Sequence, residues 1–598
     1  MRIIQRKIVS IMLYAGLITV LFFNGSILAM DTCQIIKNNN DYDSFPSSTL
    51  DLPETFDLRD VNGKDMVTSV KSQIGGTCWA HGVMAAMESN LLITDIWNLV
   101  GESGEPNLAE YHLDWWNGFN SFNNDDISGS LGLTVHYGGD YRVASAYLSR
   151  GDGAVRDKDG QSFDEPSLRS DPSYHYYYPR EIEWYTAGDQ HEHIDIIKDA
   201  LMTHGAIGTC VMAFNLDENW THYYDGSQDP NHAVTIIGWD DHKQTEAELP
   251  GAWLVKNSWG IGWGLDGYFW LSYYDVHAGH HPEMGAVSFQ DVEPFSYNHI
   301  YYHDYHGWRD TKNSVHEAFN KFIAVKNHNL TAVSFFTAED NVDYSIRVYD
   351  DFNETGLSDE LLYQEGSIMY TGFHTIDLSN PIMLSRNDDF YIYVNLSHGG
   401  HPYDKTSKVP VLLGSTMLGT IVPSTASPDQ SYFKNDFGKW IDLTEYDETA
   451  NFCIKGLVGK QSDLVVQHGI MLHDVQPGST QHVNFTVENH GAAWSKLKWE
   501  MTEMPSWGEW SFNVEENNKG LYPEEKGQVV ETTIKIPDEE EQTFDGVITI
   551  KNSENPLDVE KVTISISTQE NNADNARTLY TKILQMMDYF KDLLFLFN

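Results

Sequence analysis

A cysteine between a glycine-rich turn and a helical stretch is the feature that most constrains this chain. The segment QIGGTCWAHG predicts a turn that ends at Cys78 and a helix from Trp79 to about Leu92. A thiol at a helix N-terminus lies close to unpaired backbone N–H groups and to the positive end of the helix dipole, so its thiolate is favoured. Cys78 is therefore a candidate nucleophile, and a buried structural thiol is the alternative.

Two later segments supply the other groups that a thiol nucleophile requires. The segment NHAVTIIGW predicts a strand with His232 at its start, and the segment AWLVKNSWG predicts a second strand that ends at Asn257. Asn257 can accept a hydrogen bond from one ring nitrogen of His232 and so fix the tautomer that faces Cys78. The indole of Trp259 can cover that bond and exclude water from it.

Together these segments resemble the catalytic motifs of the papain family of cysteine peptidases. The resemblance covers roughly residues 54–290, where FDLRD (56–60) and VTSVKSQ (67–73) are similar to the mature N-terminus of that family. It implies an α+β papain-like fold with a helical half and a β-barrel-like half. It also implies acyl transfer, in which Cys78 attacks a peptide carbonyl and His232 carries the proton.

The resemblance assigns further residues to the site. The backbone N–H of Cys78 and the side-chain amide of Gln73 would hold the developing oxyanion, and Gly138 and Gly139 resemble the paired glycines of the substrate cleft. The step from Gln73 to Cys78 is 78 − 73 = 5 positions, one fewer than is usual in the family. His81, one helical turn beyond Cys78, is interpreted as a packing or rim residue, with electrostatic tuning of the site as the alternative.

The N-terminus has the pattern of an export signal. Residues 1–29 combine a basic start, a short apolar run and small residues at the end, which is typical of a secretory signal peptide; a membrane anchor is the alternative. We expect a secreted or cell-surface protein whose mature chain has no transmembrane span. Residues 30–53 predict a pro-segment or linker that is shorter than the helical inhibitory propeptide of the papain family.

Charge and cysteine content narrow the partners and ligands. The formal net charge of −49 at pH 7 argues against binding to nucleic-acid backbones or anionic lipid surfaces. We expect no cofactor and no metal, because the acidic clusters 123–126 and 157–160 lack a full calcium-loop pattern and are interpreted as solvated surface. Cys210 is interpreted as a buried small hydrophobe. With Cys78 assigned to catalysis, at most one disulfide is available among the remaining Cys33, Cys210 and Cys453.

The second half of the chain is rich in short β-prone segments. Residues 296–457 predict an antiparallel β-sandwich with turns at 350–353 and 398–400. This region resembles the lectin-like domain that follows the peptidase in some bacterial and archaeal members of the papain family. It is a candidate for carbohydrate binding, and a structural or spacer domain is the alternative.

The last third of the chain contains no catalytic grouping. Residues 463–568 predict a second sandwich of immunoglobulin or fibronectin-III type. Residues 572–598 predict an amphipathic helix, which either docks on a partner or packs on the same chain.

The sequence therefore predicts a secreted cysteine endopeptidase that hydrolyses protein or peptide substrates through a thioester acyl-enzyme. Its C-terminal β domains would attach it to a substrate or to a surface. The alternative is a surface adhesin with a weakly active or inactive peptidase fold.

Overall fold

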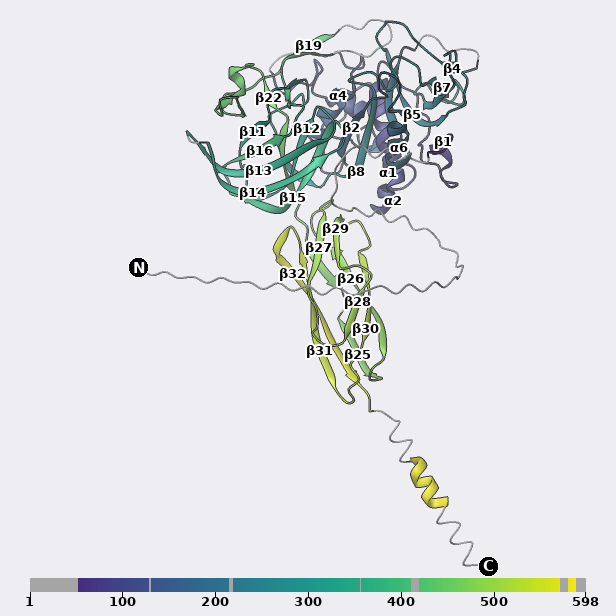
Figure 1. Cartoon of the computed structure of the whole chain (residues 1–598), viewed down its shortest axis with the longest axis vertical. Helices are drawn as coiled ribbons and strands as arrows, with labels where there is room; N and C mark the ends of the chain where they lie inside the picture. Colours follow the sequence, from purple (N-terminus) through teal and green to yellow (C-terminus); the bar gives the residue numbers. More distant parts are fainter. Residues whose placement is uncertain are drawn as a thin grey trace, which may run out of the picture. The chain divides into compact units, whose positions relative to one another are not determined.

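The computed structural model describes residues 52–127, 131–213, 219–354, 356–409, 419–467, 469–570 and 579–587 (Figure 1). The predicted signal peptide and all but the last two residues of the predicted pro-segment lie outside these residues. The described residues confirm the expected fold class, a papain-like α+β domain followed by all-β domains.

The helical half of the first domain is built around α1 (Cys78–Ile93), which begins at the candidate nucleophile. This helix is buried on nearly every side because it packs against helices on one side and against β5 and β8 on the other. A helix that is covered all round needs apolar or small residues throughout, and its alanine, methionine and leucine residues are also good helix formers. The other helices are α2 (Ile96–Leu99), α3 (Glu110–Trp116), α4 (Tyr141–Ser149), α5 (Asp157–Gly160) and α6 (Ile194–His204).

One large sheet runs from the first domain into the second. The order of its strands is β4-β7-β6-β5-β3-β8-β2-β15-β12-β23-β9, and β1 pairs with β5. The strands from the first domain are β1 (Thr55–Asp57), β2 (Tyr177–Tyr185), β3 (Ile207–Val211), β4 (Thr221–His222), β5 (His232–Asp240), β6 (Ala252–Lys256), β7 (Tyr268–Ser272) and β8 (Ala286–Pro294). The strands that follow are β9 (Tyr297–Tyr301), β12 (His328–Thr337), β15 (Gly372–Leu384) and β23 (Ile454–Gly459).

The junction of the two domains is a regular antiparallel ladder between β2 and β15. Gly372 pairs with Glu183, Phe373 with Ile182, and His374 with Glu181. Phe373 and Ile182 are both fully buried and belong to one hydrophobic cluster that also contains α1. The sequence analysis expected two separate domains and did not predict this shared sheet and core.

A second sheet completes the lectin-like region. Its order is β14-β13-β16-β11-β20-β21, and the cluster around Ile346, Ile392 and Val394 fills the space between it and the large sheet. The strands are β11 (Glu317–Ile323), β13 (Val342–Asn353), β14 (Gly356–Ile368), β16 (Asp389–Leu396), β20 (Ser431–Lys434) and β21 (Trp440–Asp442). Smaller pairings involve β10 (Asp310–Lys312), β17 (His401–Asp404), β18 (Ser407–Val409), β19 (Thr420–Val422) and β22 (Asn451–Phe452).

The predicted turns have different outcomes. The prediction of a turn at residues 350–353 is wrong, because β13 continues to Asn353, which pairs with Gly356 of β14. The turn at 398–400 is confirmed. Gly399 and Gly400 have φ values of +81° and +76°, which glycine adopts without steric cost.

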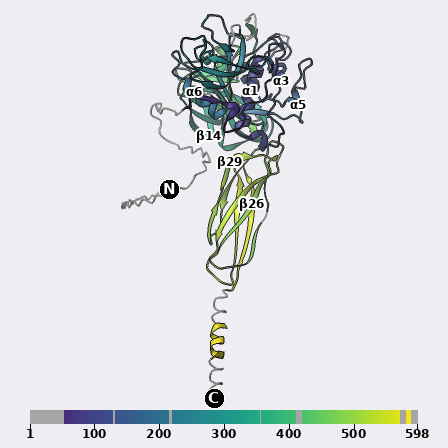
Figure 2. The ribbon, with the colours of Figure 1, turned by 90° about the vertical axis from the view of Figure 1, so that its right-hand side faces the viewer.

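The third β region forms two sheets, β24-β26-β30-β28 and β25-β32-β31-β27-β29, packed around the fully buried Trp499. Its strands are β24 (Leu464–Gln467), β25 (Ile470–Val475), β26 (Thr480–Asn489), β27 (Leu497–Glu503), β28 (Glu509–Phe512), β29 (Glu516–Leu521), β30 (Gln528–Lys535), β31 (Thr543–Asn552) and β32 (Asn555–Thr568); β26 and β29 can be followed in Figure 2.

Part of the predicted C-terminal helix is described. Residues 579–587 are helical and their side chains are exposed, including Leu579 and Met586; the rest of that prediction lies outside the described residues. The described part therefore does not pack on this chain. None of the helices in the described ranges combines the length and apolar character that a bilayer crossing requires.

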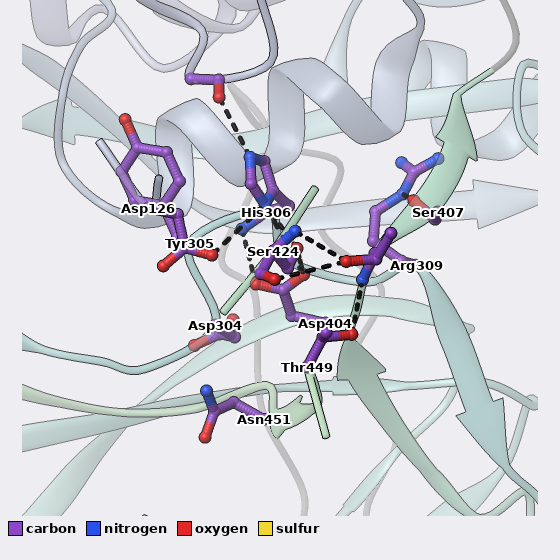
Figure 3. Close-up of polar contacts among 12 residues, drawn as sticks. Asp126, Asp304, Tyr305, His306, Arg309, Asp404, Ser407, Ser424, Thr449 and Asn451 are labelled. Carbon is purple, nitrogen blue, oxygen red and sulfur yellow. Dashed lines mark hydrogen bonds and ion pairs between the residues drawn. The ribbon is translucent and has the colours of Figure 1, made fainter. Parts of the chain in front are cut away.

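A buried polar network joins the first two domains at a second place (Figure 3). His306 Nε2 donates to the carbonyl oxygen of Gly118 at 3.0 Å, so Nδ1 of the neutral ring must accept a hydrogen bond. Ser424 Oγ lies 2.7 Å from that Nδ1 and 2.8 Å from Asp404 Oδ1. Burial lowers the pKa of His306 to about 3 and raises the pKa of Asp404 to about 8. A protonated Asp404 therefore donates to Ser424, and Ser424 donates to the neutral imidazole.

The acidic cluster 123–126 belongs to the same junction. Asn123 and Asn124 are 3% and 8% exposed, and Asp126 accepts a hydrogen bond from the backbone N–H of Thr425 at 2.6 Å. The expectation of solvated surface is therefore wrong here, because the second domain covers the loop.

Candidate active site

Cys78 is the first residue of α1 and is 1% exposed. Its side chain contacts the backbone of Ala233 in β5, and hydrogen bonds with the backbone of Ala233 and Trp79 favour the thiolate. Burial outweighs them and raises the pKa of the thiol to about 11. The helix N-terminus therefore presents the thiol to β5, but in a site closed to water.

The imidazole of His232 is held by the two residues that were predicted to hold it. His232 is the first residue of β5, and its Nε2 lies 2.7 Å from Asn257 Oδ1, one residue beyond the end of β6. Trp259 stacks on the imidazole with ring centroids 4.5 Å apart and planes at 25°. The structure thus brings His232, Asn257 and Trp259 together, with β5 placing His232 beside Cys78.

The hydrogen bonds around Asn257 determine the tautomer of His232. Asn257 Oδ1 also accepts from the backbone N–H of Ser258 at 2.8 Å, so this atom is the acceptor and His232 Nε2 is the donor. Nδ1 of a neutral ring is then free to accept a proton. Burial lowers the pKa of His232 to about 4, which keeps the ring neutral. None of the hydrogen bonds among the described residues joins Cys78 Sγ to His232, and the shifted pKa values make the two resting groups a thiol and a neutral imidazole.

Gln73 is fixed beside the nucleophile by three hydrogen bonds. Its Nε2 donates to the carbonyl oxygen of Gly75 at 2.9 Å, and its Oε1 accepts from Ser258 Oγ at 2.6 Å. Its backbone N–H donates to the carbonyl oxygen of Ser258 at 2.8 Å. One of the two N–H groups of the side chain is therefore used inside the shortened turn, and one remains for a ligand.

Gly139, the second of the paired glycines, lies against Trp79, the residue that follows Cys78. A Cβ on Gly139 would lie 2.6 Å from the indole ring of Trp79, so only glycine lets this strand of chain approach α1 so closely. Gly138 has a φ of +113°, a conformation that L side chains rarely adopt. Asp140, which follows, caps α4 by accepting from the backbone N–H of Val143 at 2.7 Å.

His81 is a buried packing residue. It is 6% exposed, and its Nδ1 donates to the carbonyl oxygen of Thr77 at 2.9 Å. Its ring packs edge-on against Tyr111 at 6.0 Å. The structure thus supports the packing role, and His81 also contributes to the lowered pKa of His232, after the larger effect of burial.

A buried charge cluster under the site was not predicted. Lys71 Nζ lies 2.7 Å from Glu88 Oε1 and 2.6 Å from Glu110 Oε1. Lys256, which precedes Asn257, donates to Thr68 Oγ1 at 3.0 Å, and Thr68 donates to Glu88 Oε2 at 2.6 Å. The cluster links β6 to α1 and α3. It therefore fixes the position of Asn257, which follows the end of β6. The sequence signal was one carboxylate in each of two largely buried helices, Glu88 in α1 and Glu110 in α3.

Two groups of potential metal ligands occur in the described residues, Asp126 with His306 and Asp404, and Glu181 with Glu183 and His374. Both nitrogens of His306 are already hydrogen-bonded. In the second group, Glu183 accepts from Gln290 at 2.7 Å and His374 Nε2 lies 3.2 Å from Thr337 Oγ1. A metal would have to displace these bonds.

The remaining sequence predictions concern cysteines and the cluster 157–160. Cys210 lies in β3 and is fully buried, as expected, and Cys210 and Cys453 are both unpaired thiols; Cys33 lies outside the described residues. Residues 157–160 form α5, where Asp159 pairs with Arg156 at 2.9 Å. Lys158 is exposed and Asp157 and Asp159 are half-buried, so the charged side chains of α5 lie at the surface.

Two protein-family models match the chain. The model described as papain family cysteine protease matches residues 137–284, and the model described as lectin like domain matches residues 300–458. The first match includes His232 and Asn257 and begins after Cys78, so the place of Cys78 in the site rests on the geometry given above.

The chain is also similar to curated cathepsins. It is 30% identical to cathepsin O from Homo sapiens over 229 residues, which cover 36% of this chain and 60% of the relative. It is 26% identical to the viral cathepsin of Cydia pomonella granulosis virus over 254 residues, or 41% and 63% of the two chains. This chain therefore spans about three fifths of the length of these relatives.

Two solved structures share the arrangement of the first two domains. One contains the cysteine protease and lectin-like domains of Cwp84, a surface layer associated protein of Clostridium difficile; it covers 69% of this chain and 90% of its own, with a TM-score of 0.54 and 20% identity. The other is clostridial Cwp84 after propeptide cleavage, with the same TM-score and identity and coverage of 68% and 99%. Residues 137–284 are therefore similar to the papain family of cysteine proteases, and residues 300–458 are similar to a lectin-like domain.

Proposed function

We propose that this chain is an exported cysteine endopeptidase in which Cys78, His232 and Asn257 are the catalytic residues. The observation that carries the proposal is the 2.7 Å bond from His232 to Asn257 under the indole of Trp259, on a strand that contacts the thiol of Cys78 at the start of α1.

The tautomer of His232 sets the order of proton transfers. Nδ1 accepts the thiol proton as Sγ attacks the peptide carbonyl, and Nε2–H remains bonded to Asn257. The imidazolium then protonates the leaving amine, which gives a thioester. In deacylation the neutral ring takes a proton from water, the hydroxide adds to the thioester, and Sγ leaves with the proton from the ring.

The oxyanion of each tetrahedral intermediate would bind the backbone N–H of Cys78 and the uncommitted N–H of Gln73. Donors of this kind contribute about 2.7–4 kcal/mol in other enzymes. Ser258 positions Gln73 by donating to its Oε1, which turns the amide nitrogen away from Ser258.

Labelling with a thiol-alkylating peptidyl epoxide tests the proposal. We expect modification of Cys78 and no modification of the equally unpaired Cys210, which lies in the middle of β3 and serves as the internal control. Cleavage of denatured protein by a Cys78→Ala variant would contradict the mechanism.

The proposal extends to domain boundaries, location and partners. We assign the peptidase to residues 54–290, the lectin-like domain to 296–457 and the immunoglobulin-like domain to 463–568. The N-terminal signal pattern and the surface-layer association of the similar Cwp84 support a secreted or surface-bound enzyme. Its substrates would be proteins or peptides, with the lectin-like domain attaching the enzyme to carbohydrate.

A second candidate is a binding protein with little turnover. It is favoured by the bond from Gln73 Nε2 to Gly75, which uses one of the two N–H groups of this amide and leaves only one for the oxyanion. A Gln73→Ala variant separates the two functions. A drop in kcat/KM of about 10²–10³ supports the endopeptidase, and equal rates in both proteins support the binding role.

A further inference from the structure

A polar groove of about 580 Å³ lies between the lectin-like domain and the strands after it. Its volume is in the range of ligand sites. It is lined by the start of β9, the start of β12, the end of β15, the connection after β23 and the hairpin between β31 and β32.

The groove is positively charged on a strongly acidic protein. The chain has 87 acidic and 38 basic residues, yet the groove contains two lysines and one carboxylate. That carboxylate, Glu554, is paired with Lys498 at 3.3 Å. Lys460 Nζ donates to the carbonyl oxygen of Phe295 at 2.9 Å, and burial lowers its pKa to about 8, so Lys326 is the lysine left for a ligand. Lys326 is exposed and forms no ion pair with any of the described residues. Its positive charge reaches the imidazoles of His299 and His328 and lowers the pKa of each, after the larger effect of burial.

Several hydrogen-bond donors of the groove are left for a ligand. The hydroxyl of Tyr301 accepts from the backbone N–H of Val325 at 2.9 Å, so its own proton goes to His328 Nε2, 2.7 Å away. This makes Nδ1–H the remaining donor of His328. Asn327 uses Oδ1 to accept from the backbone N–H of Arg386 at 2.7 Å, which leaves its NH₂ group. The Nδ1–H of His328 and the NH₂ group of Asn327 are therefore available as donors to a ligand.

Flat and apolar surfaces accompany these donors. The imidazoles of His299 and His328 are nearly parallel, at 22°, with centroids 6.4 Å apart. Met383 is 76% exposed and Val325 is 49% exposed at the rim. Sugar rings present an apolar face to such surfaces and hydroxyls to amides, whereas a free inorganic anion would use only the charge.

We propose that this groove binds an acidic oligosaccharide, with Lys326 facing the anionic groups of the sugar chain and Asn327, His328 and Gln461 facing its hydroxyls. This deepens the attachment role proposed above for the lectin-like domain and is independent of the peptidase chemistry. Carboxylate and sulfate groups share the chemistry that the groove recognises.

Calorimetric titration of the full chain tests the site. The probes are a tetrasaccharide of galacturonic acid, a heparin-derived tetrasaccharide and a neutral galactotetraose, each at about 50 mM and 500 mM salt. We expect one or both acidic probes to bind at least about tenfold more tightly than the neutral one, and to lose affinity at high salt.

Two charge reversals locate the binding. Lys326→Glu should weaken acidic binding at least about tenfold, while Lys439→Glu, an exposed lysine of the same domain outside the groove, should change it less than about twofold. Equal effects of the two variants, equal binding of the neutral probe, or no binding of either acidic probe would overturn the proposal. Cleavage of a small peptide, measured in parallel, reports on the peptidase separately.

Discussion

At the candidate nucleophile, burial opposes the charge separation that the chemistry needs. It holds the pKa of the Cys78 thiol near 11 and that of His232 near 4, so the resting pair is uncharged. The proton can then move only when a substrate carbonyl accepts the sulfur and the imidazolium has Asn257 to orient it. The free-energy cost of forming the thiolate and the imidazolium therefore arises only when substrate is bound.

Asn257→Ala tests the orientation of His232. The loss of the acceptor leaves Nε2–H unpaired in a buried site, and the ring can take the unproductive tautomer. We expect kcat/KM to fall by about 10²–10⁴, with the melting temperature changed by only a few degrees. Asn395→Ala, at a half-buried asparagine of β16, is the control. Full activity in the Asn257 variant would contradict the assigned role.

Trp259 sets the acidic limit of activity. Below its pKa of about 4, His232 is protonated while Cys78 remains a thiol, so no group accepts the thiol proton. We expect kcat/KM to fall on the acid side near pH 4. Trp259→Ala admits water, reduces the burial that lowers this pKa, and should move the acid limb toward the ordinary histidine value of about 6.5. pH–rate profiles of the two proteins measure the shift; coincident profiles would show that the indole does not shield the ring.

Among the elements, β17 brings a buried carboxyl into the junction between the domains. The folded state keeps the proton of Asp404 up to about pH 8, whereas the unfolded chain loses it near pH 3.9. Its contribution to stability is therefore fully present below that lower value and is lost as the pH rises toward 8.

Asp404→Asn should remove this pH dependence, because the amide keeps the same donor and acceptor toward Ser424 and His306. We expect the variant to gain stability relative to the parent between pH 5 and pH 8, by at most about 1.4 kcal/mol per pH unit. Thermal unfolding at both pH values measures it, with Asp388→Asn at an exposed site as the control. A pH-independent difference would mean that Asp404 is ionised in the fold.

Local signals explain which elements were predictable. The start of α1 at Cys78 and of β5 at His232 follow from short patterns of glycine, apolar and β-branched residues. The pairing of Gly372 with Glu183 joins residues 372 − 183 = 189 positions apart, and no local pattern encodes it. The bond from Gln73 to Gly75 was not predictable either, because the conformation of this turn depends on Ser258, which lies far away in the sequence.

At the scale of the molecule, the shared sheet makes the first domain dependent on the second. Without β15, the buried strand β2 would become an edge with unpaired backbone groups. Tyr178 would also lose its bond to Thr375 at 3.0 Å, and Arg180 its ion pair with Asp377 at 2.9 Å.

We therefore expect a fragment of residues 52–296 to aggregate and a fragment of residues 52–460 to be soluble. Only the longer one should react with the peptidyl epoxide at Cys78. Size-exclusion chromatography and mass spectrometry of the labelled thiol decide the outcome. A soluble, labelled short fragment would show that the peptidase core is complete without the lectin-like strands.

The ladder between β2 and β15 also fixes the spacing between the lectin-like domain and Cys78. A continuous run of backbone hydrogen bonds has no hinge, so a ligand on the lectin-like domain stays at a constant distance and orientation from Cys78. On a glycosylated substrate or a polymer-bound protein, the distance between the bound sugar and Cys78 would select the peptide bond that is cleaved. This selection would come before recognition of the local sequence by the subsites. Cleavage would then fall in a narrow band measured from the anchoring sugar.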